Sequence, residues 1–347
     1  MLSGKRHLFV TGGAGFIGSA FVRLLREEFP TVHITNFDAL TYAGNLENLE
    51  GLPADSRHRF VKGDITDRDA VFEALPEDTD AVINFAAESH VDKGIAGADE
   101  FIRTNVLGTQ VLLDVARAKD VRRFLQISTD EVMGSLPDNE PALFSEDSPL
   151  RPNNHYAASK AAAEHLVRAA HHTFGLNTVI TRCGNNFGPR QFPEKFIPVT
   201  IANALKDEPI PVYGDGLNIR DWIYVDDHCR AIRNVLENGR AGAVYNIGAR
   251  NERRNIDVAK NVLDVLGKPH SLIRFVKDRP GHDRRYAIDP SLIESELGWR
   301  PTETWEGSLY KTIEWYRSNS EWVERARRGN PFREHYSKQN GMEATVP

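Results

Sequence analysis

The stretch His7-Leu8-Phe9-Val10-Thr11-Gly12-Gly13-Ala14-Gly15-Phe16-Ile17-Gly18 decides the fold of this chain. Residues 7–11 predict a buried strand, the glycines predict a tight loop, and residues 19–28 predict an amphipathic helix. The glycines at 12, 15 and 18 permit a tight turn, close approach of the main chain to a pyrophosphate, and close packing of helix on strand. The helix N-terminus then offers N–H groups and its dipole to phosphates. This order of elements predicts a dinucleotide-binding loop, which a glycine triplet alone does not.

Asp38 completes this pattern, because it follows a second predicted strand (residues 32–37) and lies twenty residues beyond Gly18. A carboxylate at this place accepts a hydrogen bond from the adenosine ribose 2′-OH and repels a 2′-phosphate. The sequence therefore predicts NAD rather than NADP.

Further strands are predicted at residues 60–65, 81–87, 123–128 and 176–181, with helices between them. This alternation predicts an α/β fold of the Rossmann type, a doubly wound parallel sheet covered by helices on both faces. Ligands of such sheets lie at the carboxyl ends of the strands. We therefore expect Asp64 and Ile65 beside the adenine, and the small Ala86 and Ala87 to leave room for the cofactor. Thr104, where another helix begins, is expected to face it.

The composition excludes several classes of protein. Lys and Arg number 43 against 49 Asp and Glu, a formal charge of −6 without a basic block, so nucleic acid is not an expected partner. The two cysteines, Cys183 and Cys229, argue against a disulfide framework and suit a reducing cytoplasm. The apolar run at residues 8–10 is too short for a signal peptide or a membrane span. We expect a cytoplasmic protein of about two domains, with no metal site.

Residues 154–164 predict a helix that carries Tyr156 and Lys160 on one face, one turn apart. A phenol titrates at about 10 and is a poor base at neutral pH, but a fixed ammonium beside it favours the phenolate and lowers its pKa. An isolated pair of this spacing is more often a solvated surface pair. Here the glycine loop upstream and the cluster Ser128-Thr129-Asp130-Glu131, directly after a predicted strand, favour a catalytic interpretation.

From about residue 8 to residue 322 the sequence is similar to the dTDP-glucose 4,6-dehydratase family of the extended short-chain dehydrogenase/reductase superfamily. The glycine loop and the Tyr156–Lys160 pair carry the likeness to the superfamily, and the Asp130-Glu131 pair narrows it. The motifs that complete the resemblance are Ala86-Ala87-Glu88-Ser89-His90-Val91-Asp92, Asn185-Asn186-Phe187-Gly188-Pro189, Phe192-Pro193-Glu194-Lys195, Arg220-Asp221-Trp222 and Arg279-Pro280-Gly281-His282-Asp283-Arg284-Arg285-Tyr286.

The resemblance implies an NAD-dependent hydro-lyase that acts on a nucleotide sugar. Tyr156, kept anionic by Lys160, would take the C4 hydroxyl proton while hydride passes from C4 to NAD+, and Thr129 would hydrogen-bond the C4 oxygen. Glu131 would then remove the acidified C5 proton. Asp130, kept protonated by the neighbouring charge, would protonate the departing C6 hydroxyl. Return of hydride to C6 and of a proton to C5 leaves a 4-keto-6-deoxy sugar, so tightly bound NAD is recycled in each turnover.

The resemblance also implies which residues hold each ligand. Those expected at the cofactor are Gly12, Gly15, Phe16, Ile17, Gly18, Asp38, Thr41, Asp64, Ile65, Phe85, Ala86, Ala87, Thr104, Tyr156, Lys160 and Asn186. Those expected at the substrate are Ser89, Thr129, Asn185, Lys195, Phe196, Pro211, Tyr213, Arg220, Asn255, Arg279 and His282. Lys195, Arg220 and Arg279 are expected at the diphosphate, where cations bind. Pro211, Tyr213 and Asn255 are expected at the nucleobase.

We expect residues 1–190, with 223–248 returning to them, to form the NAD-binding domain. Residues 191–222 and 249–330 are expected to form a smaller α/β sugar-nucleotide lobe, with helices at 255–266 and 290–297. A tail at 331–347 follows, and the chain is expected to fray after Asn319. The family uses the helices that carry Tyr156 and Thr104 in a two-fold dimer, so a homodimer is expected.

Three positions depart from the family pattern: Met133 and Phe187 each replace a usual Tyr, and Gly94 replaces a usual Ser. Met133 removes a hydroxyl expected near the sugar. The alternatives are a 4,6-dehydratase of a CDP-, UDP- or GDP-linked hexose, a 4-epimerase, and a non-catalytic binding module on the same fold. An epimerase has no use for Asp130 and Glu131, and a binding module predicts a damaged Tyr–Lys pair, whereas this pair is intact.

Overall fold

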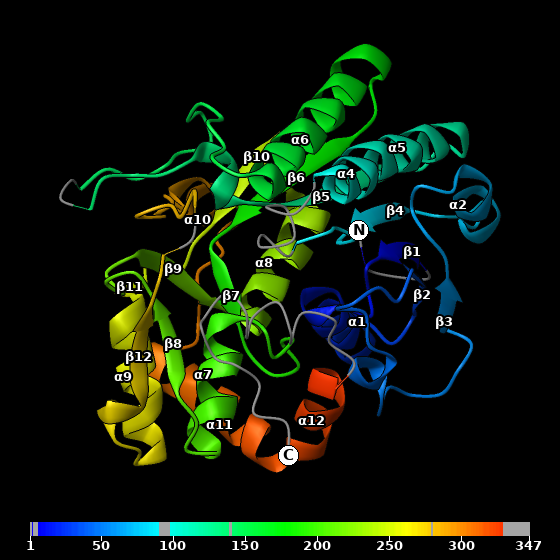
Figure 1. The fold of residues 1–347 in the computed structure, drawn as a ribbon. Helices are drawn as coiled ribbons and strands as arrows, with labels where there is room; N and C mark the ends of the chain where they lie inside the picture. The colour runs from blue at the N-terminus through cyan, green and yellow to red at the C-terminus, as the bar shows by residue number, and fades with distance from the viewer. Residues whose placement is uncertain (1, 3–5, 90–97, 139–140, 279, 329–347) are drawn as a thin grey trace.

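A seven-stranded sheet forms the centre of this computed structural model, which describes residues 2, 6–89, 98–138, 141–278 and 280–328 (Figure 1). All neighbouring strands are parallel, in the order β10-β6-β5-β4-β1-β2-β3. The strands are β1 (Arg6–Thr11), β2 (Val32–Asp38), β3 (His58–Lys62), β4 (Ala81–Asn84), β5 (Arg123–Thr129), β6 (Thr178–Cys183) and β10 (Val244–Ile247). The order reverses between β1 and β4, so a crevice is expected beyond their carboxyl ends.

Helices cover both faces of this sheet, as its central strands β4, β5 and β6, which are buried throughout, require. One face carries α1 (Phe16–Glu28), α8 (Val225–Asn238) and α10 (Ser291–Leu297), and the other carries α2 (Arg68–Ala74), α5 (Thr109–Ala118) and α6 (His155–Phe174). Each set encloses its own apolar cluster, with Phe21 and Ile232 on the first face and Leu112 and Val167 on the second. The predicted doubly wound parallel sheet is confirmed.

The second half of the chain builds two small sheets, ordered β11-β9-β7 and β12-β8, beside four helices that share a third apolar cluster. Figure 1 shows these elements, in green to orange, below and to the left of the large sheet. They are β7 (Asn185–Phe187), β8 (Ile210–Tyr213), β9 (Ile219–Tyr224), β11 (Glu252–Arg254), β12 (Ile273–Val276), α7 (Phe196–Leu205), α9 (Asn255–Leu266), α11 (Trp305–Ser318) and α12 (Ser320–Arg328).

The remaining elements are short turns of helix. They are η1 (Leu46–Leu49), α4 (Asp99–Phe101), the π-helical η2 (Ile102–Gly108), η3 (Asp130–Met133) and η4 (His270–Leu272). Within the described residues, no helix combines the length and apolar character needed to cross a membrane.

Three predicted boundaries were wrong at the crevice. The strand β3 ends at Lys62 rather than residue 65, β4 ends at Asn84 rather than residue 87, and α1 begins at Phe16 rather than residue 19. Pairing between neighbouring strands stops there, at Asp38 with Lys62 and at Asn84 with Gln126. The apolar residues that follow the two strands therefore leave the sheet and line the crevice as loops.

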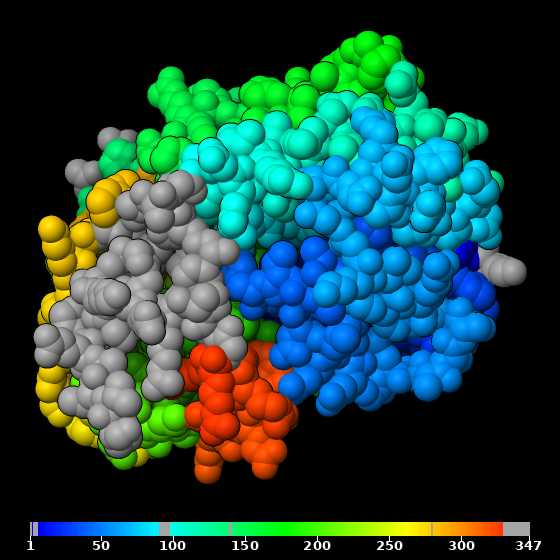
Figure 2. All heavy atoms as spheres, turned by 45° about the vertical axis from the view of Figure 1, so that its right-hand side comes forward, coloured from blue at the N-terminus to red at the C-terminus, as the bar shows by residue number. Residues whose placement is uncertain are grey.

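Two helices pack differently from the prediction. The helix α10, expected in the smaller lobe, packs on α8 and β10, and its Ile293 lies in the cluster beneath α1. The helix α12 does not fray, because Trp322 and Val323 are buried in the third cluster. Figure 2 shows this orange-red helix against the blue N-terminal part of the chain, where Arg325 pairs with Glu47 at 2.8 Å. Residues 331–347 lie outside the described residues.

Candidate active site

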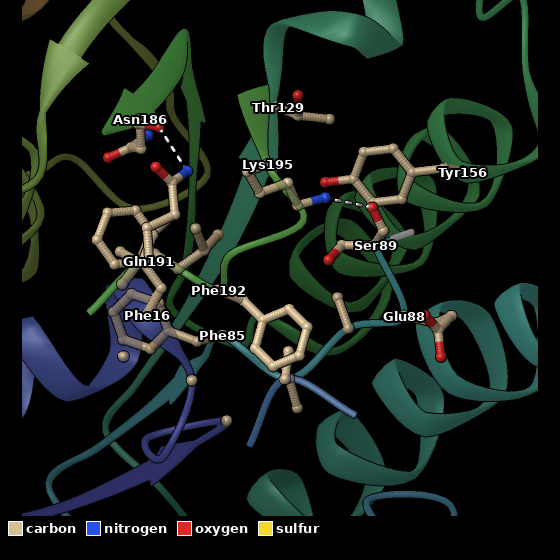
Figure 3. A pocket seen from close by; sticks show the side chains of 18 of the residues that line it. Phe16, Phe85, Glu88, Ser89, Thr129, Tyr156, Asn186, Gln191, Phe192 and Lys195 are labelled. Carbon is tan, nitrogen blue, oxygen red and sulfur yellow. Dashed lines mark hydrogen bonds between the residues drawn. The ribbon is translucent and has the colours of Figure 1, made fainter. Parts of the chain in front are cut away.

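A cavity of about 490 Å³ opens at the carboxyl ends of β1, β4 and β5 and is bounded by residues of both halves of the chain (Figure 3). Its volume lies in the range of small-molecule and cofactor sites. With one exception, every residue predicted above as catalytic, cofactor-binding or substrate-binding lines this cavity. The exception is Arg279, which lies outside the described residues. The fold thus gathers the predicted set, while the role of each member stays a prediction.

The glycine loop packs so closely on its neighbours that two of its glycines leave no room for a side chain. Gly12 has a φ of +68°, and a Cβ on it would lie 2.6 Å from the main-chain nitrogen of Ala86. A Cβ on Gly18 would lie 2.3 Å from the oxygen of Gly12. Gly15 precedes α1 without a side-chain cap, and Phe16, Ile17 and Gly18 of the first turn line the cavity, so the N–H groups of this helix end are available to a phosphate. These residues fit the pyrophosphate of a dinucleotide.

Asp38 braces the same loop from the end of β2. One of its carboxylate oxygens accepts from the nitrogen of Ala14 at 2.9 Å and the other from the nitrogen of Leu40 at 2.8 Å. Burial raises the pKa of Asp38. Each oxygen keeps a second lone pair, so the carboxylate can also accept from ribose hydroxyls, as predicted for NAD.

The helix α6 carries Tyr156 and Lys160 on one face, as predicted. It begins where the side chain of Asn154 accepts from the nitrogen of Ala157 at 2.8 Å, and it ends at Gly175, whose φ is +69°. Lys160 is 4 % exposed, and its Nζ donates to the main-chain oxygen of Ile127 in β5 at 2.6 Å. Burial lowers the pKa of Lys160 to about 8.

The predicted lowering of the Tyr156 pKa by Lys160 was wrong for the protein groups alone. The pKa of Tyr156 is raised well above its usual value, first by burial and then by the charge of Glu131, with smaller contributions from Cys183 and Asp130. A hydrogen bond with Thr129 acts in the opposite direction. Lys160 is not among the groups that shift the pKa of Tyr156 most.

The Thr129-Asp130-Glu131 cluster lies where β5 passes into η3. Asp130 is 2 % exposed; its Oδ1 accepts from Thr129 at 3.3 Å, and its Oδ2 has no hydrogen-bond partner among the described residues. The pKa of Asp130 is raised well above its usual value by burial first and by Glu131 second. The sequence predicts the neighbouring charge as the cause of this shift, whereas burial is the larger cause. The direction agrees with a protonated acid.

A buried ion pair supports this cluster from behind. Glu164 of α6 and Arg182 of β6 pair at 2.8 Å, with 0 % and 4 % of their side chains exposed. Glu164 also accepts from the hydroxyl of Ser128 at 2.6 Å, directly before Thr129. The pair therefore fixes the end of β5 to α6 and β6, and with it the residues that follow.

The second half of the chain brings cations and rings to the opposite wall. Lys195 donates from Nζ to the oxygen of Ser89 at 3.3 Å, as the dashed line in Figure 3 shows. The guanidinium of Arg220 lies 4.2 Å from the centre of the Tyr286 ring and donates to the main-chain oxygen of Asp283 at 2.9 Å. The sequence predicted these cations but not the groups that hold them.

The structure adds residues that sequence reasoning missed. Tyr42 lines the cavity with its hydroxyl 3.1 Å from that of Ser89, and its position directly after Thr41 was the available signal. Cys183 also lines it and accepts at Sγ from the amide of Asn186 at 3.4 Å. Trp222 was quoted in a motif without a role and lies in the wall.

Two of the departures from the family pattern, Met133 and Phe187, do not line the cavity. Met133 is 2 % exposed, and its sulfur lies 3.6 Å from the guanidinium of Arg182. The loss of a hydroxyl near the sugar stays a prediction. Phe187 is buried in the third apolar cluster. Gly94 lies outside the described residues.

Comparison with known proteins shows what this chain is similar to. The family described as GDP-mannose 4,6 dehydratase matches residues 9–312. The dTDP-glucose 4,6-dehydratase of Xanthomonas campestris pv. campestris (strain B100) is 52 % identical over 334 residues, which cover 91 % of this chain and 94 % of the relative.

Solved structures give the same picture. The dTDP-glucose 4,6-dehydratase of Streptomyces venezuelae, crystallised with NAD, matches with a TM-score of 0.89 and 49 % identity, covering 92 % of this chain and 99 % of that one. The enzyme of Bacillus anthracis in complex with NAD matches with a TM-score of 0.87 and 43 % identity over the same shares of the two chains.

Proposed function

This chain belongs to the GDP-mannose 4,6 dehydratase family. From its identity of about half to dTDP-glucose 4,6-dehydratases we infer that it is an NAD-dependent dTDP-glucose 4,6-dehydratase. It is a hydro-lyase that converts dTDP-glucose to dTDP-4-keto-6-deoxyglucose and water, as the dehydratase relatives are named. One observation carries the assignment to this site: a single cavity holds the dinucleotide loop at Gly12–Gly18, the Tyr156–Lys160 pair and a buried acid next to a second carboxylate.

The site chemistry begins at Tyr156. When bound at the glycine loop, NAD+ would supply a positive charge, the acceptor for the C4 hydride and the donor for the later return of hydride to C6. Since burial and Glu131 keep the Tyr156 phenol protonated in the protein alone, we propose that Tyr156 becomes a base only in the loaded site. Thr129 positions the C4 oxygen, and Lys160 stays anchored to the oxygen of Ile127 on β5.

The elimination uses the two carboxyl groups in different protonation states. Asp130 is the acid, because its buried carboxyl has a raised pKa and a side-chain oxygen that no described group satisfies. It gives its proton to the C6 hydroxyl, which leaves as water. Glu131 is less buried and is the base that removes the C5 proton.

The substrate is a nucleotide sugar, and we propose that its diphosphate lies between Lys195 and Arg220. We also propose the two-lobe division predicted from sequence, with α10 assigned to the large sheet. A homodimer through η2 and α6 is proposed because Ile102 and Leu107 of η2 are 53 % and 51 % exposed beside α6. A cytoplasmic location remains part of the proposal.

The function is tested with purified protein and dTDP-glucose, with CDP-, UDP- and GDP-glucose as controls. We expect only dTDP-glucose to give an efficient 4-keto product, and substrate deuterated at C4 to give product deuterated at C6. Recovery of the C4 epimer would show a 4-epimerase instead. Equal turnover of another nucleotide sugar would contradict the dTDP-glucose specificity.

Glu131→Gln separates oxidation from elimination. This variant should still transfer hydride from C4 to NAD+, while loss of water slows by about 10²–10⁴-fold, the range of a lost general base. Product analysis by mass spectrometry gives the rate of water loss. If the variant lost water as fast as the wild type, Glu131 would not be the base. The dehydratase assignment itself would still be decided by the turnover of dTDP-glucose.

A further inference from the structure

His228 of α8 is a buried imidazole with one polar contact among the described residues. It is 0 % exposed, and its Nδ1 lies 2.8 Å from Oδ1 of Asn186, while its Nε2 is buried without a partner in the described chain. Buried polar groups are normally satisfied, and a half-satisfied one is retained at a cost. The contact with Asn186 is the one polar interaction that His228 makes among the described residues, and we ask what this contact does.

The orientation of the Asn186 amide follows from its other neighbours. Its Nδ2 donates to the main-chain oxygen of Gly184 at 3.1 Å and to Sγ of Cys183 at 3.4 Å. Both neighbours are acceptors, so the amide nitrogen faces them and the amide oxygen faces His228. An oxygen at 2.8 Å requires a hydrogen on Nδ1.

The imidazole can supply only that one hydrogen. Burial lowers the pKa of His228 to about 3, so the ring is neutral at physiological pH. A neutral ring carries a single N–H, which must therefore lie on Nδ1, and the bare nitrogen is the unpartnered Nε2. If the Asn186 amide rotated by half a turn, its nitrogen would face this N–H and its oxygen would face the oxygen of Gly184. Both contacts would be repulsive.

Asn186 carries this fixed orientation into the cavity, which it lines together with Cys183 and Lys160. With both amide hydrogens directed to the protein, the amide can offer a ligand only the second lone pair of its oxygen. We propose that His228 is a positioning residue, whose Nδ1–H holds Asn186 as a hydrogen-bond acceptor for a donor group on the nicotinamide half of NAD. This inference rests on the proposed function, since it takes Asn186 to be a cofactor contact.

The test compares two substitutions of nearly equal size. In His228→Asn a side-chain N–H can take the place of the Nδ1–H, whereas His228→Leu has no donor. The readouts are the NAD content of the purified protein and the Kd for NAD+ after stripping and titration. We expect His228→Leu to bind NAD+ about tenfold more weakly, in line with one lost hydrogen bond that orients a buried group. We expect His228→Asn to stay close to the wild type.

A double-mutant cycle separates positioning from general support of the fold. If His228 acts through Asn186, then His228→Leu adds nothing to the loss of NAD affinity in an Asn186→Ala background. Asn234→Ala serves as the matched control, since Asn234 lies on the same helix and its amide donates to the oxygen of Leu297 at 2.8 Å. We expect this control to retain NAD.

Three results would overturn the inference. They are equal affinities of His228→Asn and His228→Leu, additive losses in the double variant, and an Asn186→Ala protein that binds NAD+ like the wild type. Each of them leaves the dehydratase assignment standing, because turnover of dTDP-glucose by the wild-type protein is measured separately.

Discussion

Asp130 and Glu131 are neighbours in the chain, and burial first and the charge of Glu131 second raise the pKa of Asp130 well above the usual value. Neighbours in the chain thus occupy different surroundings, since Asp130 is 2 % exposed whereas Glu131 is only partly buried. An elimination needs this difference, because one group must hold a proton while the other takes one.

Asp130→Asn should abolish the alkaline limb of the pH–rate profile, on which the rate falls as the pH rises. A raised pKa means that Asp130 stays protonated above the usual range, and that acid catalysis is lost as the pH rises through its pKa. The amide cannot deliver a proton, so water loss should slow by about 10²–10⁴-fold and lose its response on that limb. The measurement is the rate of water loss against pH. Asp264→Asn, at an exposed carboxylate that contacts His270, should leave the profile unchanged.

Lys160→Met should change how stability depends on pH. The pKa of Lys160 is lowered from 10.5 to about 8, so between these values the unfolded chain binds more protons than the folded one. The stabilising contribution is therefore present above the unfolded pKa and is lost as the pH falls through the folded pKa. Relative to the variant, wild-type stability should rise by a few kcal/mol between about pH 8 and about pH 10. Urea unfolding of both proteins across this pH range gives the free energy of unfolding against pH. If the wild type and the variant depended on pH in the same way, the prediction would be wrong.

Gly18→Ala should weaken cofactor binding more than it weakens the fold. The new Cβ would lie 2.3 Å from the oxygen of Gly12, so the loop must move away from the phosphate position. We expect NAD content and affinity to fall by at least about tenfold. Gly267→Asn is the control, because its φ of +65° is one that Asn tolerates and a Cβ there meets nothing within 4 Å. Normal NAD content in Gly18→Ala would contradict the fit of the loop.

Arg182→Leu should destabilise the protein by about 3–5 kcal/mol, because it leaves the buried Glu164 without its partner. The double variant Arg182→Leu/Glu164→Leu should recover much of this loss, since two apolar residues leave no buried charge. Arg317→Leu removes an exposed partner of Glu314 and should cost no more than about 1 kcal/mol. Denaturant unfolding of the wild type and the three variants gives the comparison. An Arg182→Leu protein as stable as the wild type would contradict the prediction.

Local pattern was enough to predict most of the large sheet. The strand, glycine loop and helix around Gly12 occupy consecutive residues, and the helix with Tyr156 is likewise one continuous segment. Residues such as Asp38, Ala86 and Thr129 were predictable from pattern, because they stand where parallel strands end at one edge. The substrate-side residues of the second half, such as Lys195 and Arg220, were implied by the family resemblance instead.

What failed depends on contacts between distant residues. No pattern near Ile293 indicates that α10 lies on α8, and none near Trp322 indicates a buried helix at the end of the described chain. The Tyr156 pKa was predicted from Lys160 alone, whereas burial and Glu131 determine its direction. The ring of His228 acquires its contact with Asn186 across 42 positions of sequence.

The edge strand β10 has a consequence for synthesis on the ribosome. It pairs with β6, but three strands of other sheets, β7, β8 and β9, lie between β6 and β10 in the sequence, and β10 ends only at Ile247. A nascent chain therefore exposes the pairing edge of β6 until residue 247 of 347 has emerged. An open strand edge is a template for pairing with other chains. The emerging protein consequently has a long interval in which a chaperone can protect that edge from neighbouring nascent chains.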